Sequence, residues 1–208
     1  IQGCNFHDTA ILFAITTVQF SIVMIIARGS FQLARTIANG ELDNFLSLPK
    51  NILWQISVSK TEVSAFGDLI FGVGIYFLSG NVSMESFGIF ILLSILTAVI
   101  FFNFIVITQS IAFFVGNFEE AAVQLFHALL GFTLYPQTAF SGVLKIIMLT
   151  VIPAFFIATL PVQIFRKFNL SLLALIIGFA ILTFLVAIFI FQKGLKRYES
   201  GNLINIKM

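Results

Sequence analysis

The chain has few charged residues and almost no cysteine, tryptophan or histidine. Charged side chains make up 10% of its 208 residues, and the net charge at pH 7 is only +2. So small and dispersed a charge argues against a nucleic-acid partner. Cys4 is the single cysteine, so the chain holds neither a disulfide framework nor a cysteine metal site. One tryptophan and three tyrosines are too few for the aromatic girdles of an outer-membrane barrel.

Motifs for catalysis are missing as well. The sequence has no Gly-x-x-x-x-Gly-Lys-Ser/Thr motif, so we do not expect the chain to hydrolyse ATP itself. His127 lies in an apolar stretch with no second candidate ligand nearby, and metal or general-base chemistry needs such partners. We therefore expect His127 to pack between helices, and we predict neither an enzyme nor a metal site.

Apolar residues dominate what is present. The chain is 59% hydrophobic, has 27 phenylalanines and has a mean hydropathy of +1.07. One soluble core does not bury so much apolar surface, so we predict an all-α, polytopic membrane protein with a single transmembrane domain, 1–208. Runs without charge, or with charge only near one end, predict spans at about 9–27, 63–79, 87–115 and 170–191.

The region 119–168 allows two arrangements. Its first part, 121–135, is apolar but short, and its second part, 140–165, contains Pro153 and Pro161, where a helix must kink or end. Either 119–135 crosses the membrane and 140–165 forms a re-entrant pair of short helices, or 121–135 lies at the interface and 142–164 crosses.

Lysine and arginine predict the orientation, because they favour cytoplasmic loops. Positive residues cluster in 28–60 and in the C-terminal tail, whereas the loop 80–86 has none. We therefore expect 28–60 and the tail in the cytoplasm and 1–8 outside. Arg166 and Lys167 then lie outside, against the rule. Because the chain begins outside and with Ile1, we expect one further span upstream, which makes six in all.

The segment 38–51, ANGELDNFLSLPKN, interrupts the hydrophobic pattern with charges. Apolar residues from Phe31 to Leu46 recur at helical spacing, and polar residues fill the other positions. Gly40 permits a local break, and Pro49 disfavours helix at the residue before it. We predict one or two amphipathic helices along the membrane surface, which either merely connect two spans or dock a cytoplasmic partner.

Four stretches, in register along the chain, resemble one branch of the ABC type-2 permease family. They are IQGCNFHDTAILFAI at 1–15, IANGELDNFLSLPKN at 37–51, YPQTAFSGVLKIIMLTVIPAFFIATLP at 135–161 and GLKRYESGN at 194–202. Together they cover both ends and the middle of the chain. The resemblance implies the membrane subunit of an ATP-driven exporter in a bacterial cytoplasmic membrane, here without its first span.

Several site assignments follow from this resemblance. It implies a homo- or heterodimer of permease subunits that pairs with two separate ATPase subunits, which would bind ATP and Mg, so that this chain needs no cofactor. The segment 30–50 would be the coupling helix in a groove of the ATPase, with contacts at Gly40, Glu41, Leu42, Asp43, Phe45, Leu46 and Pro49. The family fold also favours a span at 119–135 and an outer re-entrant hairpin at 140–165, with breaks at Pro136, Pro153 and Pro161.

Other polar residues allow two interpretations each. Glu119 and Glu120 either suit the positive end of a helix dipole or form a second, smaller ATPase contact. Asn103, Thr108 and Gln109 either line a transport path or bond between helices. Asp68, the one acidic residue within a span, supports a competing hypothesis, an ion-coupled secondary transporter or channel. Its place near the span's start favours a structural role. No span specifies the substrate.

Overall fold

The computed structural model describes residues 6–47, 49–80, 83–133 and 152–198, and these residues form helices and turns without any strand. The predicted all-α class is thus confirmed. The helical elements are α1 (Phe6–Ala27), the 3-10 helix η1 (Arg28–Gln32), α2 (Leu33–Ala38), α3 (Asp43–Leu46), α4 (Ile52–Val58), α5 (Ala65–Leu78), α6 (Met84–Ser110), α7 (Ala112–Val115), α8 (Glu119–Thr133), the π-helical η3 (Phe155–Thr159), α10 (Leu160–Arg166) and α11 (Leu170–Leu195).

Three helical stretches are long and apolar enough to cross a membrane, by length and composition: Phe6–Ala38, Met84–Val115 and Leu170–Leu195. Two apolar helices are shorter, α5 and Phe155–Arg166. At 1.5 Å per residue α5 is about 21 Å long, less than the roughly 30 Å of a bilayer core. The chain is therefore a multi-pass membrane protein, and a total of five crossings stays a prediction.

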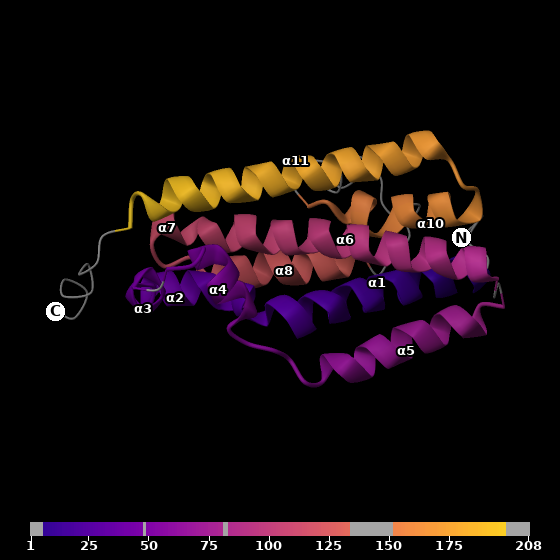
Figure 1. Cartoon of the computed structure of the whole chain (residues 1–208), viewed down its shortest axis with the longest axis horizontal. Coiled ribbons are helices and arrows are strands. Elements are labelled where there is room, and N and C mark those ends of the chain that lie inside the picture. Colours follow the sequence, from indigo (N-terminus) through magenta and orange to yellow (C-terminus); the bar gives the residue numbers. More distant parts are fainter. Residues whose placement is uncertain (1–5, 48, 81–82, 134–151, 199–208) are drawn as a thin grey trace.

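Helix α6 forms the centre of the bundle, with α1 and α11 packed along it and α5 packed against α1 (Figure 1). Close approach of α1 and α5 depends on Gly72, because a Cβ atom there would lie 2.8 Å from Val18 Cγ2. Helices α5 and α6 meet through the stacked rings of Tyr76 and Phe90, whose centroids are 4.4 Å apart. Small residues and aromatic stacking thus bring these helices together.

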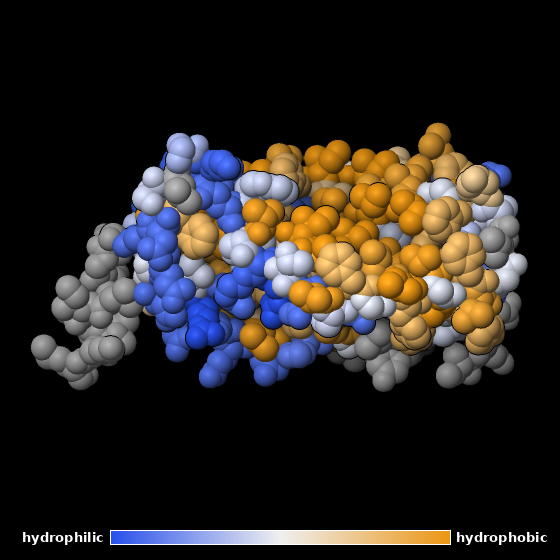
Figure 2. Space-filling view, turned by 60° about the horizontal axis from the view of Figure 1, so that its bottom comes forward, coloured by the Kyte–Doolittle hydropathy of each residue, from blue (hydrophilic) through white to orange (hydrophobic). Residues whose placement is uncertain are grey.

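The two ends of the bundle differ in polarity. One end, which we call the coupling end, is formed by η1, α2, α3, α4, α7 and the last turns of α11 (Figure 1). On the face that Figure 2 shows, hydrophilic residues gather over this end and hydrophobic residues cover most of the rest. Segment 28–60 and the basic end of α11 therefore share one end, the arrangement that the lysine and arginine distribution predicts.

The re-entrant region is only partly described. Pro136 and the rest of 134–151 lie outside the described residues. Pro153 precedes a helix, and its carbonyl accepts a hydrogen bond from Ile157 N at 3.1 Å. The stretch Phe155–Arg166 is helical through Pro161, so no helix ends there, and a kink at Pro161 stays a prediction. The π-helical turn of η3 ends just before Leu160, and Pro161 lies in the first turn of α10, where a missing amide donor is tolerated.

Candidate functional site

The coupling segment, residues 30–50, directly extends the first long helix. The helix α1 leads through the 3-10 helix η1 into α2, and the backbone angles of Ala27 and Gln32 at the two junctions are not helical. Helix α2 ends at Ala38, two residues before Gly40, whose φ of +70° lies in the left-handed region. Glycine tolerates this conformation because it has no Cβ atom. The predicted break at Gly40 is present, and the segment consists of short helices, with α3 beyond the turn.

Most of the predicted contact residues are accessible. Glu41, Asp43 and Pro49 are exposed, Gly40 and Phe45 are half-buried, and 44% of the Leu46 surface is exposed. Exposed acidic and apolar side chains at the tip of the bundle are able to contact a partner. This surface therefore fits the predicted role of the segment.

Leu42 requires a correction. Its side chain is completely buried, in a cluster made of Leu33, Ala34, Ile37, Leu42, Ile56, Ala112 and Phe191. The helical spacing places Leu42 on one face with Leu46, but the turn at Gly40 interrupts the helix and directs Leu42 inward. Leu42 therefore packs the coupling segment against α4, α7 and α11, and its side chain is not accessible to a partner.

Gln109 anchors the coupling segment to α6. Its Oε1 atom accepts a hydrogen bond from the backbone N–H of Ala34 at 2.9 Å, and both groups are buried. Ala34 lies in the first turn of α2, where backbone amides lack partners within the helix. The side chain of Gln109 thus replaces a missing helical hydrogen bond, a role that spacing along the sequence does not reveal.

Asn103 and Thr108 are also buried within the bundle. The Asn103 amide donates to Ala180 O at 3.3 Å and to Thr183 Oγ1 at 3.1 Å, which joins α6 to α11. Thr108 bonds to carbonyls of its own helix, at Phe104 and Ile105. These contacts support bonding within the helix bundle, and a transport path along these residues stays a prediction.

Glu119 and Glu120 begin α8, where their charges complement the helix dipole. Glu120 is exposed and Glu119 half-buried. The preceding residue, Phe118, packs against the same buried cluster as Leu42. The two acidic residues therefore lie at the coupling end, and both of their predicted roles agree with this position.

Charged and polar groups also make contacts within and beside the coupling segment. Arg28 pairs with Glu62 at 3.3 Å, and its guanidinium lies 5.4 Å from the centroid of the Phe31 ring. On the other side, burial raises the pKa of Tyr198 to about 12, and the negative charge of Asp43 contributes to this rise. Asp43 therefore lies beside the end of α11, where it interacts with Tyr198, although its side chain is exposed.

A comparison with protein families identifies the chain. The family model described as ABC-2 family transporter protein matches residues 1–201. The chain belongs to the ABC-2 transporter family. No curated protein and no solved structure matches it. Membership makes this ABC-2 chain a membrane component of a transporter that works with ABC ATPase subunits.

Two polar residues considered in the sequence, Asp68 and His127, lie outside the coupling segment of the ABC-2 chain. Asp68 is half-buried in the first turn of α5, a position where a carboxylate complements the helix dipole. His127 is exposed, so the expectation that it packs between helices is wrong. The described residues contain no group of three histidine, cysteine or acidic side chains that would hold a metal ion.

Proposed function

We propose that this chain is the permease subunit of an ATP-driven exporter and that its coupling segment docks on a separate ATPase subunit, which binds ATP and Mg. The observation that carries this proposal is the run of helical elements α1, η1 and α2 from Phe6 to Ala38, which follow one another without a loop and lead to the exposed tip formed by Gly40 and α3. A helix that spans the membrane and reaches a partner in the cytoplasm transmits movement between them.

The packing at the coupling end supports this transmission. The buried cluster around Leu42 includes Ile56 from α4, Ala112 from α7 and Phe191 from α11. The hydrogen bond from Ala34 to Gln109 also links α6 to these packed helices. A partner that displaces α3 therefore displaces several helices together, as rigid-body switching requires. We propose a second permease copy, identical or related, as the other half of the transport path.

Co-purification of the ATPase tests the docking surface. Leu46→Asp places a charge on an exposed apolar contact, and we expect the ATPase to be lost from affinity-purified complexes. Val63→Asp is the matched control, because Val63 is an exposed apolar residue outside the predicted contact set and close to the start of α5. Both variants should elute as folded protein on gel filtration.

Leu42 is unsuitable for this test, since a charge at a buried position would unfold the coupling end. Retention of the ATPase by Leu46→Asp at the level of Val63→Asp would contradict docking through α3. Transport would then have to be coupled through another surface.

A further inference from the structure

Helix α8 carries a polar stripe on the side that faces away from the bundle. The residues of this stripe recur at helical spacing: Glu120, Gln124, His127 and Gly131. All four are exposed, and a Cβ atom at Gly131 would meet no other atom within 4 Å. The opposite side of the helix is buried, with Leu129 completely enclosed. The bundle therefore holds α8 by its apolar side and leaves the polar stripe uncovered.

The ring contacts of Phe126 show how deep this stripe lies. The centroid of the Phe126 ring is 6.5 Å from that of Phe20 on α1 and 6.3 Å from that of Phe101 on α6. Phe101 lies near the middle of 86–118, a run without any charged residue. His127 directly follows Phe126, so its imidazole lies close to the depth of Phe101. The stripe thus extends from the coupling end into the hydrocarbon region.

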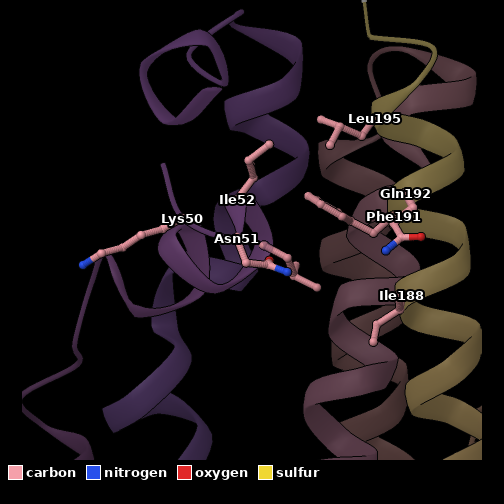
Figure 3. Close-up of a pocket in the computed structure, with 8 residues that line it drawn as sticks. Lys50, Asn51, Ile52, Ile188, Phe191, Gln192 and Leu195 are labelled. Atoms are coloured by element: carbon pink, nitrogen blue, oxygen red, sulfur yellow. The ribbon is translucent and has the colours of Figure 1, made fainter. Parts of the chain in front are cut away.

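Helix α11 shows what a lipid-facing surface of this chain is made of. Between its first turn and Phe189 the exposed residues are all apolar, and they include Ile181, Leu182 and Leu185. Towards the coupling end, the first exposed polar residue of α11 is Gln192, which lines a pocket of about 290 Å³ between α4 and α11 (Figure 3). An exposed glutamine and histidine deep in the bundle do not fit this pattern, so lipid is not what covers the stripe.

The hydrogen-bonding groups of the stripe match copies of themselves. Lipid tails offer no hydrogen-bond partner, so Gln124 and His127 need a polar surface opposite them. A carboxamide and a neutral imidazole each carry both a donor and an acceptor, and each can therefore pair with an identical side chain. A lysine, which only donates, or a carboxylate, which only accepts, cannot do so. The stripe is therefore complementary to the same stripe on a second copy of this chain.

Membrane orientation restricts how two copies meet. Lysine and arginine cluster at the coupling end and favour the cytoplasm, so both copies have the same orientation. The two-fold axis that relates them then runs along the membrane normal, and residues beside it meet their own equivalents. Glu120, whose carboxylate would repel its equivalent, begins α8 at the coupling end, where water and salt screen the charge. Only the two self-complementary residues lie deeper.

We propose that the polar stripe of α8 is the contact surface between two copies of this chain, with Gln124 and His127 each hydrogen-bonded to its equivalent across the two-fold axis. Gly131 leaves room for the two backbones to approach. This inference rests on the second permease copy proposed above and names the surface through which it binds. It does not involve the ATPase, so docking of the ATPase and contact between the copies are tested separately.

Disulfide cross-linking in membranes tests where the copies meet. The full chain carries Cys4→Ser, which removes the single native thiol, and His127→Cys, which leaves Gln124 in place. Copper phenanthroline should then produce a disulfide-linked dimer. Leu182→Cys is the matched control, because Leu182 is a 56% exposed residue on the apolar surface of α11, and it should stay monomeric on the gel. Equal cross-linking at the two positions would overturn the proposal.

A second measurement tests the hydrogen bonds. Sedimentation equilibrium of the detergent-solubilised chain gives the dimer dissociation constant, and Gln124→Leu should raise it by about fivefold, which corresponds to about 1 kcal/mol, the order of a hydrogen bond between membrane helices. Gln192→Leu is the control, because it removes the same exposed side chain outside the stripe and should leave the constant unchanged. An unchanged constant in Gln124→Leu would overturn the proposed pairing.

Two further outcomes separate this contact from the existence of a second copy. If the unmodified chain sediments as a dimer but His127→Cys forms no disulfide, the copies meet elsewhere, and only the proposed surface is overturned. Rapid reaction of that cysteine with a membrane-impermeant maleimide would then assign the stripe to a water-filled path. A chain that stays monomeric at every concentration would overturn both the surface and the pairing of identical copies.

Discussion

Asp8 and Arg166 form a two-point ion pair that joins the first turn of α1 to the last turn of α10. Arg166 Nε donates to Asp8 Oδ1, and Nη2 donates to Oδ2. The Asp8 side chain is 7% exposed and the Arg166 side chain 45% exposed. This pair lies at the end of the bundle opposite the coupling end, and α1 continues from it to the coupling segment.

Removing either partner should destabilise the protein, but not equally. Arg166→Met removes the charge partner of a buried carboxylate and should cost about 3 kcal/mol. Asp8→Asn leaves only a half-exposed guanidinium, which water can solvate, and should cost about 1 kcal/mol. Unfolding of the purified chain in detergent measures both losses, with the double variant as control. Equal losses in the two single variants would contradict the burial of Asp8.

Gly29 should tolerate no side chain. A Cβ atom there would lie 1.9 Å from the carbonyl oxygen of Ile56, so Gly29→Ala must separate η1 from α4 at a cost of at least about 2 kcal/mol. Gly67→Ala in α5 is the matched control, because its Cβ would meet nothing within 4 Å. We expect this control to be neutral or up to about 1 kcal/mol more stable. Thermal unfolding of both variants checks the contrast.

Asn103 and Thr183 should be energetically coupled. A double-mutant cycle of Asn103→Ala and Thr183→Val in detergent should yield a coupling energy of about 0.6 to 1.7 kcal/mol, the range of hydrogen bonds between membrane helices. The cycle isolates the bond between α6 and α11 from other effects of each substitution. Additive losses would show that the bond to Thr183 contributes little and would leave the Ala180 carbonyl as the partner of Asn103 on α11.

Tyr198 should make stability depend on pH at the alkaline end. Its pKa is raised to about 12 in the folded protein, against an ordinary value of about 10. Between these values the unfolded chain loses the proton and the folded chain keeps it, so stability falls as pH rises from 10 to 12. Unfolding midpoints across this range should show a shallower fall in Tyr198→Phe. Asp43→Asn should lower the pKa of Tyr198, as followed by ultraviolet absorbance.

Local features of the sequence predicted the helical character of the molecule and part of the candidate site. Long apolar runs favour helices in a membrane, and the glycine at position 40 allows the turn that ends α2. The distribution of lysine and arginine predicted that segment 28–60 and the end of α11 share one end. Each of these properties depends on composition or on near neighbours, which the sequence displays directly.

Contacts between distant residues were decided by the tertiary structure alone. The family resemblance implied that Leu42 contacts the ATPase, but packing of α2, α4 and α11 buries it. Proline chemistry predicted a kink or an end at Pro161, and the structure shows a chain that stays helical there, with a π-helical turn just before it. No spacing rule pairs Asp8 with Arg166, because such pairs depend on which helices lie side by side. The sequence by itself therefore determined the membrane helices, the turn at Gly40 and the family resemblance, and only the tertiary structure decided which side chains are exposed at the coupling end and which hold the bundle together.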